Sequence, residues 1–258
     1  MTVRSTLSSY LAPEAAISEL SRRIALAREP APDARIPRPN LLRFLGEAQT
    51  LAEPLRRPFQ RTKVTKAAHP RTVMVLPGFA THPVRLRYLA RQLERAGHSA
   101  KRWGMGFNLG ASEECFDILE KRLIELRRRS GEPVVLLGWS LGGIFARELA
   151  KRQPECVAKV ITMGSPFSGD PRSNNVWRAY QFVAGHSVDN PPVEADVAAK
   201  PPVETVALWS PRDGIIAPRS ACGNPGERDR AIALRCTHLG FSKSAESIAA
   251  VLAELDRD

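Results

Sequence analysis

Ser140 is the residue whose surroundings most clearly indicate chemistry. A short apolar run, 134–139, leads into the sequence Gly-Trp-Ser-Leu-Gly at 138–142, and a segment typical of a helix follows at once. A strand, a sharp turn and a helix in this order present a serine at the tip of the turn. Gly138 and Gly142 carry no Cβ atoms that would collide where strand and helix meet. The helix N-terminus points backbone N–H groups at the serine. The sequence therefore predicts a nucleophile at Ser140; the alternative is a buried turn with an inert serine.

Two further residues can complete a catalytic set with Ser140. A serine hydroxyl needs a histidine to take its proton and a carboxylate to orient that histidine. Asp213 follows the apolar segment 203–209, and His238 follows the segment 231–236. Polar residues that follow parallel strands gather at the carboxyl edge of the sheet. The sequence therefore predicts that Ser140, Asp213 and His238 act together.

The remaining segments are those that must position these residues. Apolar segments predict strands at 71–76, 99–103, 134–139, 157–163, 203–209 and 231–236. Amphipathic patterns predict helices between them, at 81–96, 112–129, 144–151 and 242–255. Strands that alternate with helices indicate an α/β fold with a mainly parallel sheet and helices on both faces.

Two segments fall outside this alternation. Residues 1–68 predict an N-terminal helical extension, with helices at 13–29 and 41–55, before a main domain at 69–258. The extension is basic, so it can lie on a membrane surface; the more common arrangement packs such a helix on its own domain. Residues 164–203 are rich in Gly, Pro, Asn and Ser and interrupt the alternation of strands and helices.

Composition bounds the class of protein. The chain has 258 residues, 43% of them hydrophobic, and a net charge of +11. No apolar run approaches the roughly 20 residues that span a bilayer, and the N-terminus lacks the apolar core of a signal peptide. We expect a cytoplasmic protein, with peripheral contact with an anionic membrane as a further expectation. No nucleic-acid motif is present, and the four cysteines match no zinc or redox spacing.

The ordered set of motifs resembles the serine hydrolases of the α/β-hydrolase fold, in their lipase/esterase branch. The matching pieces are Leu76-Pro77-Gly78-Phe79, Gly138-Trp139-Ser140-Leu141-Gly142-Gly143, Gly164-Ser165-Pro166-Phe167, Ser210-Pro211-Arg212-Asp213-Gly214-Ile215-Ile216 and Thr237-His238-Leu239-Gly240. They lie within residues 71–258. The resemblance implies a short lid or cap insertion at about 167–200; the alternative is a loop that covers the sheet edge. The resemblance implies that backbone N–H groups of Leu141 and Phe79 form the oxyanion hole. Many relatives have His-Gly where this chain has Pro77-Gly78.

The resemblance also separates rival residues. In this family the acid and then the base follow the serine in the chain, which disfavours His82. His186 lies in the irregular insertion and is interpreted as a surface or lid residue. Asp170 follows a strand that carries the acid in some hydrolases, whereas Asp229 is interpreted as a local ion-pair partner. Asp213 and His238 are preferred.

The predicted activity is hydrolysis of a carboxylic ester through an acyl-enzyme intermediate, with no metal and no organic cofactor. An acyltransferase or a thioesterase would use the same triad, and a non-catalytic lipid-binding protein at a membrane surface is the alternative of another class. Trp139, Trp177, Tyr180 and Phe182 are the predicted substrate-binding residues. The aromatic residues of the insertion favour a medium or long acyl chain, and thus a role in lipid metabolism.

Cys222 and Cys236 flank the loops of the predicted acid and base. A disulfide between them would join these loops, but a cytoplasmic location favours free thiols. Both states stay open on the sequence.

Overall fold

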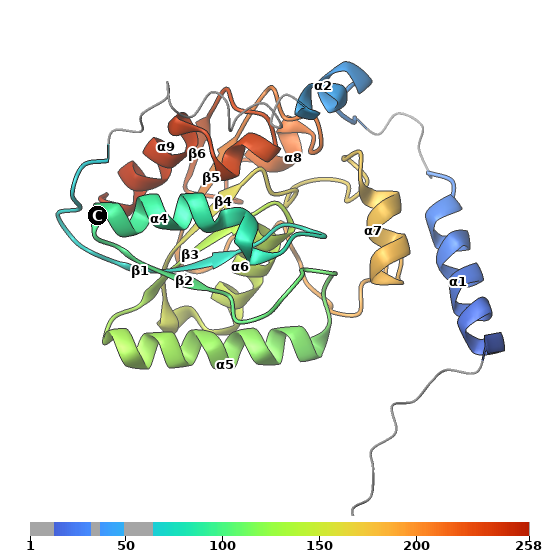
Figure 1. Cartoon of the computed structure of the whole chain (residues 1–258), viewed down its shortest axis with the longest axis horizontal. Coiled ribbons are helices and arrows are strands. Elements are labelled where there is room, and N and C mark those ends of the chain that lie inside the picture. Colours follow the sequence, from blue (N-terminus) through green and yellow to red (C-terminus); the bar gives the residue numbers. More distant parts are fainter. Residues whose placement is uncertain (1–12, 32–36, 49–63, 258) are drawn as a thin grey trace, which may run out of the picture.

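The computed structural model describes residues 13–31, 37–48 and 64–257. These residues form a sheet of six parallel strands in the order β2-β1-β3-β4-β5-β6 (Figure 1). The strands are β1 (Thr72–Leu76), β2 (Ser99–Arg102), β3 (Val134–Trp139), β4 (Val157–Met163), β5 (Glu204–Trp209) and β6 (Arg230–Ala233). The predicted mainly parallel sheet is confirmed.

Helices cover both faces of this sheet, and the pleat of each strand divides the core between them. Val73 and Val75 of β1 belong to a buried cluster with α4 (Arg87–Ala96) and α9 (Ala245–Leu255). The alternate residues Met74 and Leu76 belong to a second cluster on the opposite face. That cluster includes residues of α5 (Glu113–Ser130) and α6 (Leu141–Arg152). Alternate residues of a strand point to opposite faces, so strands buried on both faces are apolar throughout.

The remaining elements of the described residues are four further helices and three 3₁₀ turns. The helices are α1 (Pro13–Arg28), α2 (Leu41–Gly46), α7 (Trp177–Ala184) and α8 (Pro218–Cys222), and the 3₁₀ turns are η3 (Pro83–Leu86), η4 (Pro154–Cys156) and η5 (Leu239–Ser242). The sequence predicts a helix at 41–55. In the structure, the α-helix α2 has six residues and ends at Gly46. The part of the prediction beyond residue 48 lies outside the described residues. The strand predicted at 231–236 ends at Ala233, and the chain turns before His238.

The helix α1 lies beside α7, which belongs to the predicted insertion (Figure 1). Its contacts are polar: Arg22 donates to the carbonyl of Gly185 at 2.8 Å, and Arg23 to that of Val183 at 2.6 Å. Ile17 and Leu20 on the same helix are 64% and 50% exposed. Two arginines of α1 thus tie this helix to the end of α7, while the apolar side chains of Ile17 and Leu20 face solvent.

Arginines also hold the insertion itself. Arg147 of α6 is fully buried and donates to the carbonyls of Val197, Ala198 and Ala199 at 3.0–3.1 Å. Burial lowers the pKa of the Arg147 guanidinium to about 10, and the carbonyl dipoles that face it stabilise its charge. The end of the insertion is therefore fastened to the helix that follows Ser140.

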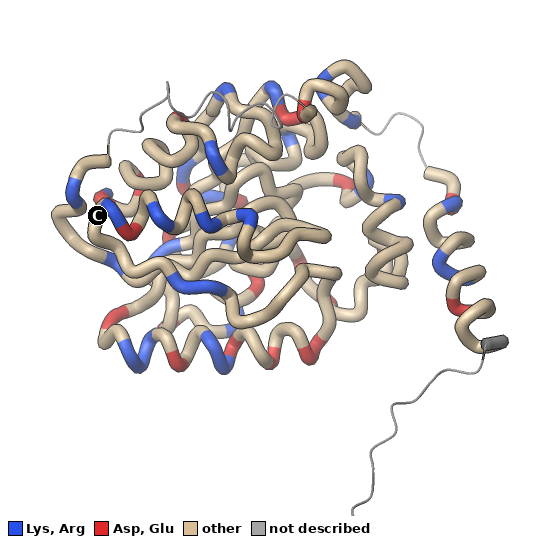
Figure 2. Tube along the Cα trace, viewed as in Figure 1, with Lys and Arg blue, Asp and Glu red and all other residues tan. Residues whose placement is uncertain are grey.

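Charge is spread over several elements. Figure 2 shows Lys and Arg on α4 and α5, with Asp and Glu between them along α5. In the part of the chain that the structure describes, no helix is both long enough and apolar enough to cross a membrane. Contact with an anionic membrane stays a prediction.

Candidate active site

Ser140 adopts a backbone conformation that non-glycine residues rarely take. Its φ is 53° and its ψ is −123°, between the end of β3 and the start of α6. Such a conformation costs on the order of 1–3 kcal/mol and persists only where the surrounding structure imposes it. Two backbone hydrogen bonds hold the turn: the Ser140 N–H donates to Met163 at 2.8 Å, and its carbonyl accepts from Gly143 at 2.9 Å.

Glycines make this turn possible. A Cβ atom on Gly138 would lie 2.3 Å from the carbonyl oxygen of Gly142, and one on Gly142 would lie 2.3 Å from that of Leu76. The ends of β1 and β3 and the first turn of α6 are therefore in direct backbone contact. The close packing predicted from the two glycines is present, with the backbone of β1 as an additional partner.

Asp213 and His238 form a buried pair at the same edge of the sheet. Asp213 Oδ2 lies 2.7 Å from His238 Nδ1, and the two residues are 0% and 2% exposed. The other oxygen, Oδ1, accepts the N–H groups of Ile215 at 2.8 Å and Ile216 at 2.7 Å. These bonds stabilise the charged carboxylate away from water. The carboxylate contacts Nδ1, so the other ring nitrogen of His238, Nε2, is left to exchange a proton with a nucleophile.

Residues bonded or adjacent to Ser140 contact this pair. The Trp139 indole donates to the His238 carbonyl at 3.1 Å, and the two rings are 5.6 Å apart. A Cβ on Gly164 would lie 3.1 Å from both Asp213 Oδ2 and His238 Nδ1, and Gly164 directly follows the residue that accepts the Ser140 N–H. The hydroxyl of Ser140 forms no hydrogen bond with the His238 ring here; such bonds are often long in the absence of substrate.

The two predicted oxyanion donors follow the strands β1 and β3, which are neighbours in the sheet. Phe79 follows β1 and Leu141 begins α6, after β3. Neither backbone N–H donates to an acceptor within the described residues. Ligands in parallel sheets bind where strand order reverses, and β1 and β3 lie on either side of that reversal. Two unengaged N–H groups beside the serine can hold a developing oxyanion.

Asn108 fixes the loop that carries Phe79, which the sequence did not indicate. Its side chain is fully buried and donates to the carbonyl of Pro77 at 2.8 Å, and its own carbonyl accepts from Ala80 at 2.7 Å. Ala80 has a positive φ of 52°, which is strained for a residue with a Cβ atom. Asn108 thus forms hydrogen bonds with Pro77, before Phe79, and with Ala80, after it, and these bonds stabilise the strained turn.

The predicted substrate-binding residues fall into different places. Tyr180 lies against Phe79, with ring centroids 5.2 Å apart, and burial raises its pKa to about 12, so its phenol stays neutral. Phe182 is 37% exposed. Trp139 contacts the ring and the carbonyl of His238. Trp177 is buried, and the guanidinium groups near its ring, at 4.2–5.6 Å, are those of Arg38, Arg172 and Arg178.

The rival residues have other partners. His82 accepts from the N–H of Val84 at 3.3 Å, and His186 lies against Tyr180. Asp170 is exposed and accepts from the backbone of Arg172. Asp229 pairs with Lys200 at 2.9 Å, as its interpretation as an ion-pair partner expects.

The cysteines are free thiols in this structure, Cys222 and Cys236 included. Burial raises the pKa of Cys236 to about 12, so this thiol stays protonated and is a poor nucleophile. Among the residues that the structure describes, no cluster of three or more His, Cys, Asp or Glu side chains has a metal-binding arrangement.

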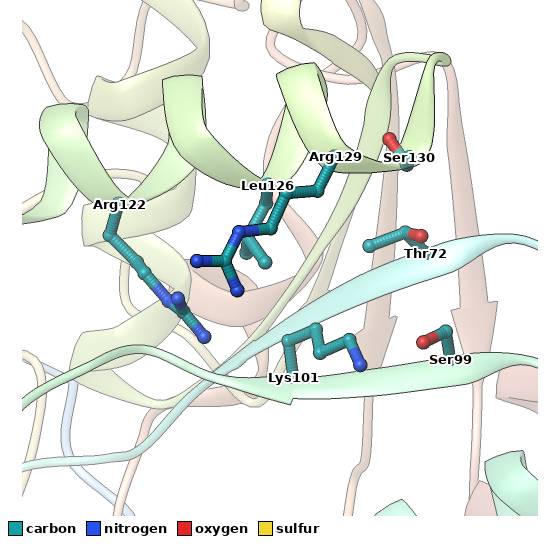
Figure 3. Close-up of a pocket in the computed structure, with 7 residues that line it drawn as sticks. All are labelled: Thr72, Ser99, Lys101, Arg122, Leu126, Arg129 and Ser130. Carbon is teal, nitrogen blue, oxygen red and sulfur yellow. The ribbon is translucent and has the colours of Figure 1, made fainter.

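A surface hollow of about 300 Å³ lies elsewhere. It is lined by Thr72, Ser99, Lys101, Arg122, Leu126, Arg129 and Ser130 (Figure 3). Thr72 and Ser99 are the first residues of β1 and β2, so this hollow lies at the opposite edge of the sheet from Ser140. Two of its three cations, Arg122 and Arg129, are paired with Glu125.

The sequence and the fold were compared with those of known proteins. No family model matches the chain. A stretch of 60 residues, 23% of the chain, is 40% identical to the biotin biosynthesis bifunctional protein BioHC of Teredinibacter turnerae, but spans only 10% of that protein. Aspergillus fumigatus lipase B superposes with a TM-score of 0.54 at 17% identity, over 73% of this chain and 53% of the lipase.

Two further solved structures are similar over most of their own length. Bacillus licheniformis lipase BlEst2 has a TM-score of 0.54 at 16% identity, over 74% of this chain and 96% of that chain. MGS-MChE2, an α/β-hydrolase enzyme from a lagoon sediment metagenome of Mar Chica, Morocco, has a TM-score of 0.50 at 21% identity, over 74% and 91%. The chain has the α/β-hydrolase fold. In this α/β-hydrolase fold, Ser140 occupies the turn between β3 and α6.

The steric contact at this turn can be tested through stability. Gly138→Ala forces a Cβ atom against the α6 backbone, so we expect it to lower the free energy of unfolding by about 1–3 kcal/mol or more. Gly106→Ala is the matched control, because a Cβ atom there meets nothing within 4 Å. Urea unfolding followed by circular dichroism measures both; equal stabilities for the two variants would contradict the observed packing.

Proposed function

We propose that the chain is a serine hydrolase that cleaves carboxylic esters through an acyl-enzyme intermediate. The observation that carries the proposal is the buried Asp213–His238 hydrogen bond of 2.7 Å, with His238 in contact with Trp139, the residue before the strained Ser140. Hydrolases among the similar structures support the fold on which this chemistry is common, but the activity rests on the site.

The first half of the proposed reaction transfers the acyl group of the ester to Ser140. Ser140 Oγ attacks the ester carbonyl carbon while His238 Nε2 takes the hydroxyl proton. The negative charge moves to the carbonyl oxygen, which accepts hydrogen bonds from the N–H groups of Leu141 and Phe79. The C–O bond to the alcohol then breaks, and His238 gives its proton to the leaving alcohol. Asp213 stabilises the imidazolium form between these steps.

Water completes the cycle. His238 takes a proton from a water molecule, which attacks the acyl carbon of the ester formed with Ser140. The second tetrahedral intermediate breaks its bond to Ser140 Oγ, which regains the proton from His238. The carboxylic acid leaves. No metal or organic cofactor takes part in this proposal.

The strain at Ser140 supports catalysis over a purely binding role. Residues held in conformations that cost on the order of 1–3 kcal/mol cluster at functional sites, active sites among them. An acyltransferase or a thioesterase has the same geometry, and products distinguish these activities. The proposal takes water as the acceptor of the acyl group.

Apolar side chains beside the oxyanion loop support a medium or long acyl chain. Phe107 and Leu109 are 60% and 55% exposed on the loop that Asn108 fastens to the end of β1. Tyr180 of α7 contacts Phe79 from the insertion. Exposed apolar residues around a polar site are typical of surfaces that bind apolar ligands.

The triad predicts a specific pattern of losses. We expect wild type to hydrolyse p-nitrophenyl esters, with its optimum at medium or long acyl chains, and Ser140→Ala to lose at least about 10³-fold in kcat. Asp213→Asn should cost about 10³- to 10⁴-fold, because the imidazole loses the carboxylate that orients it. Asp170→Asn, on the exposed rival acid, is the control and should keep wild-type kcat. Full activity in Ser140→Ala would exclude the mechanism.

The oxyanion loop predicts a second, smaller loss. Asn108→Ala removes the side-chain hydrogen bond to Pro77, so the Phe79 N–H should shift from its place, with a loss of about 10- to 100-fold in kcat and little change in KM. Asn190→Ala, on an exposed asparagine, is the matched control. Ester hydrolysis at several substrate concentrations separates kcat from KM; a normal kcat in Asn108→Ala would show that the loop is fixed without this side chain.

A further inference from the structure

We infer that Glu47 is a positioning residue for the proposed reaction, because its carboxylate fixes the loops of Asp213 and His238 relative to each other. The inference rests on the proposed function of those two residues. Glu47 belongs to the N-terminal extension, which lies outside the segments that resemble hydrolases. The N-terminal extension thus supplies a part of the active-site framework.

Three backbone N–H groups of the two loops converge on this one carboxylate. Oε1 accepts from Gly214 at 2.9 Å and from His238 at 2.8 Å, and Oε2 accepts from Leu239 at 2.9 Å. Glu47 is only 5% exposed. Hydrogen bonds to an ionised acceptor away from water are about twice as strong as those between neutral groups.

The loop that carries Asp213, the acid loop, packs closely against residues 37–48, the segment that carries Glu47. A Cβ atom on Gly214 would lie 2.2 Å from the carbonyl oxygen of Arg43 and 2.9 Å from Cα of Phe44. The Asn175 side chain donates to the carbonyls of both Pro39, at 3.0 Å, and Gly214, at 2.9 Å. The contact between residues 37–48 and the acid loop therefore involves backbone against backbone, and requires glycine at 214.

These contacts bear directly on the acid–base pair. Asp213 and His238 follow different strands, β5 and β6, so their 2.7 Å hydrogen bond depends on the spacing of two separate loops. Glu47 binds the residue after Asp213 and the backbone of His238 itself. A second tie joins the loops farther from the pair, where the Ser210 hydroxyl donates to the Cys236 carbonyl at 2.6 Å. Displacements of about 1 Å in such a pair can cost 10²-fold in rate.

Glu47→Gln tests this role with little change in side-chain volume. Glutamine keeps one acceptor oxygen but places an NH₂ group where the carboxylate accepts an N–H, so at least one bond to the two loops is lost. We expect kcat for ester hydrolysis to fall about 10- to 100-fold, with KM changed by less than about threefold. The downfield proton NMR resonance of the His238–Asp213 hydrogen bond should shift or broaden.

Glu29→Gln is the matched control in the full-length chain. The Glu29 carboxylate also ties the extension to the rest of the chain, but through Gln181 at 3.1 Å and Ser187 at 3.4 Å in the insertion. This variant should keep wild-type kcat and an unchanged resonance. Thermal melts of both variants show the temperature range in which each is folded.

A purely structural role for Glu47 predicts a different result. Glu47→Gln would then melt earlier but show wild-type kcat and an unchanged resonance below its melting temperature, and this result would overturn the inference. Glu47→Asp is the second variant if the glutamine form does not fold. It keeps the charge but is one methylene shorter, so it cannot reach all three N–H groups, and the same losses are expected.

The resonance separates this inference from the proposed function. If wild type hydrolyses no ester, the proposed function fails, while the resonance in Glu47→Gln still decides whether Glu47 positions the pair. If wild type is active and Glu47→Gln matches it in kcat and resonance, only the positioning role fails.

Discussion

Three backbone segments meet around Ser140 at distances that leave no room for a Cβ atom. The end of β3, the first turn of α6 and the end of β1 are in contact through Gly138 and Gly142. This close approach forces Ser140 into its strained conformation. It also places the first turn of α6 beside the loop that carries Phe79. The strand order, with β1 and β3 adjacent, is what makes the contact possible.

The acid and the base depend on a different kind of constraint. Their loops follow β5 and β6, and hydrogen bonds from several parts of the chain hold them. Asp213 binds two N–H groups of its own loop, the Trp139 indole holds the His238 carbonyl, and Glu47 is bonded to both loops. Preorganisation of this kind removes reorganisation from the reaction itself. A basic N-terminal segment, which lies outside the hydrolase motifs, contributes Glu47 and its three hydrogen bonds to these loops.

The sequence was informative where local pattern and tertiary structure agree. Apolar segments between helices predict buried parallel strands, and the two glycines around Ser140 predict a tight turn from strand to helix. The sheet and the turn could therefore be predicted from the sequence. Asp213 and His238 could be proposed because each follows a strand, and the structure brings them together. Their catalytic roles stay a proposal until activity is measured.

Other contacts had no local signal. Glu47 lies in a segment that predicts an ordinary amphipathic helix, where a glutamate is expected to face water, and its partners follow 167 and 191 residues later. Asn108 lies among glycines that indicate a flexible loop, yet it is fully buried. The guanidinium groups of Arg38, from the extension, and of Arg172 and Arg178, from the insertion, lie near the ring of Trp177. Each of these depends on contacts between distant segments, which no periodicity encodes.

Covalent labelling tests the central claim most directly. A fluorophosphonate probe reacts with a serine only where a base activates it and an oxyanion hole receives the phosphoryl oxygen. We predict that wild type gains one probe mass, that peptide mapping assigns it to Ser140, and that Asp213→Asn reacts far more slowly. An unlabelled wild-type protein, or a label on another serine that survives in Ser140→Ala, would contradict the account.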